Sequence, residues 1–448
     1  MKSSQISLTF RALITAIALA AFCSCNDGWE DNMNPAGTVG RNPGDRTVTE
    51  YNRNVFLIYS IGFNNLSSYL KEDINDIASG RIPSGFDHDD VILVFSHSTK
   101  GSYRNPNPPA LFRIYRDWNG KPVRDTLLVM DENTVSASPQ TLNEVLTYVR
   151  DNFHARRYGM LMSSHATGWV PAGYTSKGKE MEDGEWPVTF SSATPGPVPF
   201  SEKIHTSGMP VLKSFGSQSV ADSLAYEMNI NDMADAIPMK LDYILFDACF
   251  MGGIEVAYEF REVCDRMVFS QTEIMADGMD YTTMTSYLFN GREPDLEGFS
   301  ENFYRYYDSY DQPGEETDRS ATISLVDCRE LDDLAEVCRD IFGTNRSGIA
   351  SLEGSYKVQR YFRSSSHRWF YDLRHIVEMS GATSDQLERL DQALERCVLY
   401  KAATEEFICE IQLKNHCGLS MYLPYSGLDR LNSFYRKLEW NKATGLVE

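Results

Sequence analysis

The sequence predicts an α/β fold in which helices cover both faces of a mainly parallel sheet. Short, continuous apolar runs are typical of strands buried on both faces, and stretches with apolar residues at three- and four-residue steps, typical of helices, lie between several of them. Strands that alternate with helices form a mainly parallel sheet. The expected strands are Val55–Tyr59, Val91–Phe95, Gly159–Ser163, Leu241–Phe246, Met267–Ser270, Ile323–Val326 and Leu419–Leu423, and the clearest helices are Leu66–Ile77 and Thr141–Phe153.

The composition fits a folded, acidic protein. Of the 448 residues, 42% are hydrophobic and 23% are charged, which is the balance of a globular chain rather than a disordered one. There are 42 Lys and Arg residues against 63 Asp and Glu residues, a formal charge of −21. Such a surface repels phosphate backbones and anionic headgroups. We therefore expect no nucleic-acid partner, whereas a basic peptide suits this charge.

The first residues have the pattern of an export signal. Lys2 and Arg11 precede an apolar run over residues 12–22. That run is too short to span a bilayer as a helix but suits the apolar region of a signal peptide. We therefore expect the chain to leave the cytoplasm.

Two cysteines stand at the end of this run. Cys25 follows the small Ser24 and precedes polar residues, which is similar to a bacterial lipoprotein processing site, whereas Cys23 follows the bulky Phe22 and fits less well. We expect residues 1–24 to be a lipoprotein signal peptide and Cys25 to carry a lipid that anchors the exported chain to a membrane, on the periplasmic side or the cell surface. An ordinary secretory signal is the alternative.

Composition divides the rest of the chain into a tether and one large domain. Residues 25–54 are rich in Gly, Pro, Asn and charge without apolar periodicity, as in a flexible tether. Residues 55–448 carry the strand and helix patterns. Within them, residues 170–220 show little period, and a loop of that length inside a compact domain is usually functional or disordered.

The cysteines beyond the signal do not form a recognisable framework. No CxxC pair is present, so neither a zinc ribbon nor a redox motif is indicated. An odd number leaves at least one thiol free, and we expect most of them to be buried as small apolar side chains. These seven residues are Cys249, Cys264, Cys328, Cys338, Cys397, Cys409 and Cys417.

A candidate nucleophile ends the apolar strand that begins at Lys240. The strand runs into Asp247-Ala-Cys249, and an amphipathic run follows from Ile254. In such sheets ligands bind outside the carboxyl ends of the strands, and a thiol near a helix N-terminus has its thiolate form favoured by the helix dipole. Because side chains alternate along a strand, Asp247 and Cys249 are expected to point the same way.

A second strand, residues 158–165, ends in His165. If this strand lies beside the first, the imidazole comes to the same edge as the thiol of Cys249 and can manage protons for a thiolate attack. Backbone N–H groups beside them could bind the oxyanion. Cysteine and histidine at strand ends more often have structural roles, so this pattern alone leaves both interpretations open.

Around these residues the chain resembles the clostripain family of cysteine peptidases, relatives of caspases, gingipains and legumains. Phe246–Gly252 and the following Ile254–Glu259 are similar to the nucleophile strand and helix of the family, and residues 229–237 and 240–242 to the lead-in. Gly62–Leu66 with Asp73–Asn75 is similar to the first strand and helix, and Gly418–Pro424 to a late strand. The resemblance covers roughly residue 51 to the C-terminus. It implies a caspase-like three-layer αβα sandwich, so that residues 55–448 are a peptidase domain.

The resemblance also implies roles for individual residues. Cys249 would be the nucleophile and His165 the base of a dyad, with the oxyanion held by the N–H groups of Ala166 and Cys249. Asp247 and Asp277 would line the S1 pocket, where two carboxylates favour Arg or Lys at P1. Asp247 could instead cap the following helix, and Asp277 could be a turn residue before Gly278.

The chain departs from the family at the histidine. Where the family typically has Gly, this chain has Ala166 and Thr167, whose added Cβ atoms could narrow the site although the N–H remains. Some relatives are activated by cutting the loop between the two catalytic strands after a basic residue, and Lys177 and Lys179 are candidates for that cut. Calcium dependence occurs in the family, so Ca²⁺ is a candidate cofactor even though no EF-hand loop is present. No other cofactor is implied.

The function that these observations predict is an exported, lipid-anchored cysteine endopeptidase that cleaves peptides and proteins after Arg or Lys. Two alternatives stay open. One is a catalytically silent surface lipoprotein that uses a peptidase-like scaffold to bind peptides or glycans, which Ala166 and Thr167 favour. The other is an active peptidase with a different specificity.

Overall fold

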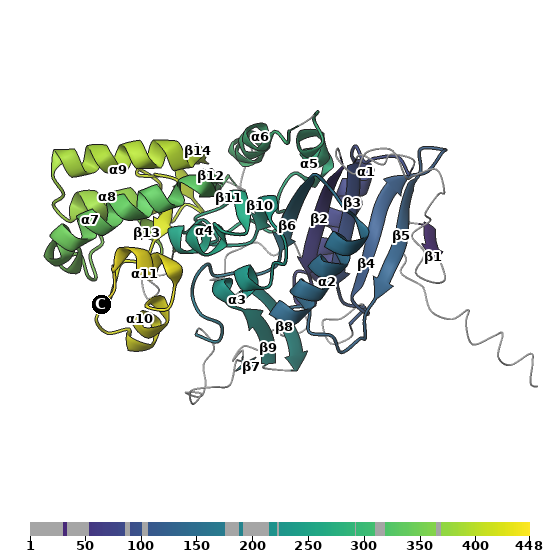
Figure 1. Ribbon diagram of the computed structural model, residues 1–448, viewed down its shortest axis with the longest axis horizontal. Coiled ribbons are helices and arrows are strands. Elements are labelled where there is room, and N and C mark those ends of the chain that lie inside the picture. The colour runs from purple at the N-terminus through teal and green to yellow at the C-terminus, as the bar shows by residue number, and fades with distance from the viewer. Residues whose placement is uncertain are drawn as a thin grey trace, which may run out of the picture.

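The computed structural model describes residues 53–85, 90–100, 106–174, 215–221, 224–291, 293–309, 319–363 and 369–448, and the backbone of two short strands at 30–33 and 188–190. In this part of the chain one sheet of ten strands carries the fold, in the order β1-β5-β4-β3-β2-β6-β10-β11-β12-β14 (Figure 1). Cys25, residues 1–29 and most of the expected tether lie outside the described residues, as do Lys177 and Lys179.

The centre of the sheet is parallel, as the sequence predicts. Its five central strands pair in parallel with one another and are buried along most of their length. They are β3 (Asp90–His97), β2 (Asn54–Ile61), β6 (Arg157–Ser163), β10 (Leu241–Asp247) and β11 (Cys264–Phe269). Burial on both faces explains why each of them is a continuous apolar run rather than an alternating one.

Antiparallel strands extend the sheet on both sides, and the sequence patterns missed most of them. The antiparallel strands are β4 (Ala110–Arg116) and β5 (Pro122–Val129) beyond β3, and β12 (Thr322–Asp327) and β14 (Val398–Ala403) beyond β11, while β1 (Glu30–Met33) lies parallel to β5. Side chains of β5 and β14 are mostly half-exposed, so their sequences lack the apolar run by which buried strands are found.

Helices cover both faces of the sheet, which confirms the predicted three layers (Figure 1). On one face α1, α5 and α6 pack side by side, and on the other α2, α3 and α4 do so. Side-chain oxygens of Ser138, Asp280 and Asp295 cap the starts of α2, α5 and α6. The bounds are α1 (Ser67–Ser79), α2 (Pro139–Asn152), α3 (Ile230–Asp235), α4 (Ile254–Phe260), α5 (Tyr281–Leu288) and α6 (Leu296–Asp308).

One expectation about the sheet was wrong in detail. Residues 419–423 do not join the main sheet, because the strand there, β17 (Ser420–Met421), pairs with β13 (Tyr371–Asp372). In and just beyond the stretch 170–220, the described residues form a small sheet in which β7 (Val188–Phe190) and β8 (Phe215–Ala221) pair with β9 (Leu224–Met228).

A second group of helices lies beyond the β14 edge (Figure 1). They are α7 (Leu331–Ala350), α8 (Leu373–Met379), α9 (Ser384–Cys397), α10 (Asp429–Tyr435) and α11 (Glu439–Thr444). Among the described residues, no helix combines the length and the apolarity needed to cross a bilayer.

Two carboxylates of α4, the buried Glu255 and the half-buried Glu259, hold the C-terminal helices in place. Glu255 accepts hydrogen bonds from the Tyr422 N–H and the Tyr435 hydroxyl, both at 2.8 Å, and Glu259 accepts from the Glu439 N–H at 2.6 Å. Burial, despite these hydrogen bonds, raises the pKa of each carboxyl from 4.5 to about 7. Both charges are therefore costly in the folded chain at neutral pH.

Glu255→Gln is expected to stabilise the fold at pH 8 and to have less effect at pH 5. A carboxyl whose pKa is raised on folding contributes stability that is present below its unfolded pKa and lost as the pH rises through 7. For Glu255 the ionised form costs on the order of 3 kcal/mol at pH 8, and glutamine keeps the accepting oxygen without the charge. Thermal unfolding midpoints at both pH values check this, with the exposed Glu388→Gln as control. Equal shifts at the two pH values would contradict it.

Candidate active site

His165 and Cys249 occupy equivalent positions at the carboxyl edge of the sheet. Strands β6 and β10 are parallel neighbours, and the last pair in their register joins Ser163 to Asp247. The Ser164 N–H continues the ladder by donating to the Asp247 carbonyl at 3.4 Å. Each candidate residue stands two positions beyond that last pair, so both lie at the predicted edge.

Asn65 holds the ring of His165, and sequence patterns did not identify it. The Asn65 Oδ1 atom lies 2.7 Å from His165 Nε2. With Oδ1 as the acceptor, the ring proton is on Nε2, and Nδ1 carries the lone pair that can take up a proton. Asn65 belongs to the loop after β2, the strand on the other side of β6. Its place in that loop could have been found only by knowing the strand order.

The neighbouring Asn64 fixes this loop. Its amide donates to the Ile61 carbonyl at 3.2 Å and to the Gly216 carbonyl at 3.4 Å, and its Oδ1 accepts from the Leu66 N–H at 2.8 Å. The Gly216 N–H in turn donates to the His165 carbonyl at 3.1 Å. The loop that carries Asn65 is therefore tied to the backbone of His165 itself.

Cys249 lies in a turn that is bonded to the segment after β11. The Phe250 N–H donates to the Thr272 carbonyl at 2.8 Å, and the Gly252 N–H donates to the Ser270 carbonyl at 2.7 Å. The half-buried thiol of Cys249 is 3.9 Å from the Ile274 carbonyl. Phe250 has a φ of +61°, a conformation that costs energy for a residue with a Cβ and is common near functional sites.

The expectation that a helix N-terminus favours the thiolate was wrong. Helix α4 begins only at Ile254 and its N-cap is Gly253, so the dipole, which falls off within one turn, does not reach the thiol. Burial and then the charge of Glu273 raise the pKa of Cys249 to about 12. In this geometry the sulfur is a protonated thiol at neutral pH.

Gly168, three residues after His165, is at a position where only glycine fits. Gly168 has a φ of +53°, and a Cβ there would lie 2.5 Å from the Phe250 carbonyl oxygen. The histidine loop and the cysteine turn thus touch backbone to backbone at that point. Ala166 and Thr167 are both buried, and their Cβ atoms are accommodated in the fold.

Three carboxylates approach one another beside the cysteine. The buried carboxylate of Asp247 accepts hydrogen bonds from the hydroxyls of Ser163, at 3.2 Å, and Tyr281. It does not cap α4, so that alternative was wrong. Asp277 lies exposed in a turn before Gly278, and a Cβ on Gly278 would be 2.9 Å from Asp247 Oδ2. Gly278 therefore packs directly against the Asp247 carboxylate, where a side chain would not fit.

Asp73 of α1 joins this group, although neither the sequence patterns nor the resemblance assigned it a role in the site. Burial, then the charges of Asp247, Asp76 and Asp277, raise the pKa of Asp73 to about 9. Burial also raises the pKa of Asp247. Asp73, on α1, and Asp247, at the end of β10, are far apart in the sequence. The only sequence feature that marks Asp73 is its position as an acidic residue among the apolar residues of one helix face. This acidic cluster, formed by the buried Asp73 and Asp247 and the exposed Asp277, would favour a cationic group.

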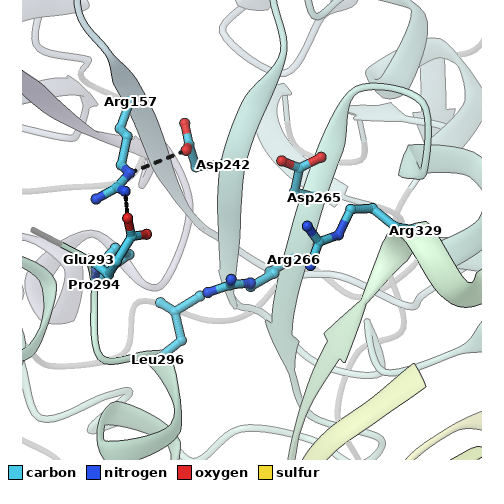
Figure 2. Close-up of a pocket in the computed structure, with 8 residues that line it drawn as sticks. All are labelled: Arg157, Asp242, Asp265, Arg266, Glu293, Pro294, Leu296 and Arg329. Carbon is cyan, nitrogen blue, oxygen red and sulfur yellow. Dashed lines mark hydrogen bonds and ion pairs between the residues drawn. The ribbon is translucent and has the colours of Figure 1, made fainter. Parts of the chain in front are cut away.

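A metal centre and a second pocket are the other places where a ligand could bind. Among the described residues, no group of three or more His, Cys, Asp or Glu side chains is arranged to hold a metal ion, Ca²⁺ included. Figure 2 shows a small pocket at the opposite, amino-terminal edge of β6, β10 and β11. There Arg157 forms ion pairs with Asp242, at 3.6 Å, and with Glu293. This pocket is a salt-bridge network remote from Cys249.

Three solved structures from two bacterial species have a similar fold. An inactive zymogen C11 protease from Parabacteroides distasonis is 28% identical, with a TM-score of 0.67 over 87% of this chain and 97% of that one. A secreted C11 cysteine protease from Bacteroides thetaiotaomicron, iotapain, is 25% identical, with a TM-score of 0.67 over 88% and 99%. A third, a secreted C11 cysteine protease from the same species in complex with an irreversible peptide inhibitor, is 22% identical with a TM-score of 0.65 over 88% and 99%, and supports the fold alone.

No curated protein matches the chain. The family model described as the clostripain family matches residues 58–181 and 221–444, which is well over half of the sequence. The match includes both strand ends that carry His165 and Cys249, and the acidic cluster beside them. The chain belongs to the clostripain family of cysteine peptidases.

Proposed function

We propose that the protein is an exported endopeptidase that cleaves peptide bonds after Arg or Lys through a dyad of Cys249 and His165. The observation that carries the proposal is the register of β6 and β10, which puts both residues two positions beyond one backbone pair. The acidic cluster of Asp73, Asp247 and Asp277 lies beside them. Peptide substrates with a basic P1 residue suit this arrangement.

The chemistry begins with the loss of the thiol proton to His165 Nδ1. The Cys249 sulfur attacks the scissile carbonyl carbon, and the oxygen becomes an oxyanion that the N–H groups of Ala166 and Cys249 can hold. In the part of the chain that the structure describes, neither N–H donates a backbone hydrogen bond. The C–N bond then breaks as His165 gives its proton to the leaving amine, and water activated by His165 hydrolyses the thioester.

Specificity for a basic P1 side chain follows from the acidic cluster. The carboxylates of Asp247 and Asp277 would pair with the guanidinium or ammonium group. Asp73, whose pKa is about 9, would give up its proton when that cation arrives, because an opposite charge favours the ionised carboxyl. Asp73 is thereby a third acid of the proposed S1 pocket.

A substrate panel tests this specificity. Fluorogenic peptides that differ only in P1 should be cleaved with Arg and with Lys, and the Arg substrate should exceed its citrulline counterpart by about a hundredfold or more in kcat/KM, since citrulline has the shape of Arg without its charge. Equal kcat/KM values for the Arg and citrulline substrates would show that the acidic cluster does not determine specificity, and would favour a peptidase of another specificity.

The intact chain is proposed to be a latent form. The raised pKa of Cys249, about 12, supports this, as does the similarity to an inactive zymogen. A cut within the loop at 170–220, for which Lys177 and Lys179 are candidates, would free the segments beside His165. Ca²⁺ is a candidate activator, without any residues assigned to it.

Asn65→Ala is expected to lower kcat roughly tenfold to a hundredfold with little change in KM. Without the acceptor at Nε2, the imidazole can adopt the other tautomer and rotate, so fewer molecules hold Nδ1 ready for the proton. Steady-state kinetics on the Arg peptide check this, with Asn119→Ala in the exposed β4–β5 turn as control. An unchanged kcat would show that His165 needs no orienting partner.

Export and anchoring are proposed from residues 1–24 and Cys25. A similar protein is a secreted C11 protease, which supports export, and the lipid rests on the sequence pattern alone. Mass spectrometry of the mature N-terminus tests both points. The proposal predicts a lipid-modified Cys25 at that end, and an unmodified residue other than Cys25 would rule out lipidation there.

A non-catalytic surface protein that binds peptides or glycans is the second candidate. The high pKa of the Cys249 thiol is the observation that favours it. Hydrolysis that depends on Cys249 would exclude this candidate.

A further inference from the structure

A buried ion pair lies next to the turn that carries Cys249. The guanidinium of Arg363 donates two hydrogen bonds, each 3.0 Å long, to the two carboxylate oxygens of Glu273. The side chains of Arg363 and Glu273 are 3% and 6% exposed. A third hydrogen bond, 3.1 Å long, joins Arg363 to the half-exposed Glu410. Such a pair costs desolvation energy, so its retention calls for a reason beyond stability.

Glu273 belongs to the segment 270–274, which is hydrogen-bonded to the turn that carries Cys249. The carbonyls of Ser270, Thr272 and Ile274 face Gly252, Phe250 and the thiol of Cys249, respectively. Glu273 lies between the last two of these carbonyls. By holding the Glu273 side chain with two bonds, Arg363 fixes the segment on which the position of the sulfur depends.

Glu410 extends this anchor to the surface. It follows the tight turn of the hairpin formed by β15 (Glu406–Phe407) and β16 (Ile411–Gln412), where Ile408 and Cys409 have positive φ. The Ile408 N–H donates to the Ser320 hydroxyl at 2.7 Å, which fixes the hairpin to the chain before β12. Arg363 therefore bridges a buried segment and an anchored hairpin.

We propose that Glu273 and Arg363 are paired positioning residues that set the reactivity of the Cys249 sulfur, with Glu273 opposing the thiolate and Arg363 favouring it. The charged groups that act on the thiol are Glu273, Asp247 and Arg363, of which Glu273 has the largest effect and Arg363 alone favours the thiolate. Glu410 acts on Glu273 in turn. The inference rests on the proposed function only in taking Cys249 as the nucleophile.

The two charges have opposite consequences when each is removed. Without Arg363, the one charge that favours the thiolate is gone, and the fraction of Glu273 that stays ionised disfavours the thiolate further. Without the charge of Glu273, the guanidinium would remain and favour the thiolate. Since the pair sits where few waters can screen it, both effects should be measurable. A purely structural pair would instead give the same direction of change in both variants.

The test measures alkylation of Cys249 by iodoacetamide at pH 8 in the full chain, followed by mass spectrometry of the peptide that contains it. No peptidase activity is needed, so failure of this proposal is distinguishable from failure of the proposed function. Glu273→Gln should speed alkylation about threefold and Arg363→Gln should slow it about threefold. These factors correspond to a shift of about one pKa unit, partly offset by the higher nucleophilicity of the more basic thiolate.

Controls separate this effect from a general loosening of the fold. Arg389→Gln breaks an exposed ion pair with Asp340 and should leave the rate unchanged. Free N-acetylcysteine added to every sample reports on reagent and pH. If Arg363→Gln does not fold, the double variant with Glu273→Gln, which leaves neither charge unpaired, should return the rate close to that of the parent. Alkylation that is not faster in Glu273→Gln, or a double variant as fast as Glu273→Gln alone, would overturn the proposal.

Discussion

His165→Ala is expected to lower kcat for an arginyl peptide amide by on the order of 10⁴-fold, with a much smaller change in KM. The reason is that the Cys249 thiol, with a pKa of about 12, has almost no thiolate at neutral pH unless a nearby base takes its proton. The leaving amine also needs a proton, and His165 is its expected donor. Both steps lose their catalyst in the variant.

The matched control for this variant is His154→Ala. His154 is exposed in the turn after α2, and its removal should leave kcat within about twofold, as surface substitutions usually do. Steady-state kinetics on the loop-nicked chain give both values. If His165→Ala keeps more than about a tenth of the parental kcat, another group manages the protons and the dyad is wrong.

Asp247→Asn is the second change with a large expected effect, a loss of about a hundredfold or more in kcat/KM for Arg and Lys substrates. The amide keeps the size of the side chain but removes the negative charge at Asp247. The cationic P1 group of the substrate is then desolvated there without an anionic partner. The neutral citrulline substrate should change by less than about threefold, because it does not depend on that charge. Comparing the two substrates isolates electrostatics from damage to the nearby Cys249.

Substitutions at the other two acids of the cluster, Asp73 and Asp277, should have smaller effects than Asp247→Asn. Asp73→Asn alone should cost less than about tenfold, since Asp73 is protonated at neutral pH, with a pKa of about 9, and contributes only when a cation binds. The control is Asp265→Asn. Asp265 lies at the opposite edge of the sheet, where it pairs with Lys240 at 3.2 Å. Cleavage after Arg and Lys that survives in an Asp247→Asn, Asp277→Asn double variant would assign specificity to other residues.

The central strands could be predicted because a strand buried on both faces is a continuous run of apolar residues. Strands β2, β3, β6 and β10 appear as apolar runs, and the carboxyl ends of β6 and β10 carry His165 and Cys249. The half-exposed strands β5 and β14 carry no such run, and the turn at Gly168 depends on a backbone contact with Phe250 that no periodicity records.

The residues that sequence patterns missed act across large separations. Asn65 meets His165 across 100 positions of the chain, and Arg363 meets Glu273 across 90. Each contact depends on the order of strands in the sheet, which a list of elements does not determine. The pKa of Cys249 was misjudged for a related reason. Its burial and its nearness to Glu273 come from packing, whereas the helix start that suggested a thiolate lies too far along the chain.

The central claim is that Cys249 performs peptide hydrolysis, and it is tested most directly by one comparison. Parent and Cys249→Ala chains, each intact and nicked within residues 170–220, are incubated with a fluorogenic Arg or Lys peptide with and without Ca²⁺. The account predicts cleavage after the basic residue by the nicked parent and none above background by Cys249→Ala in any condition. Cleavage that persists in Cys249→Ala, or a parent that is inactive in every condition, would contradict it.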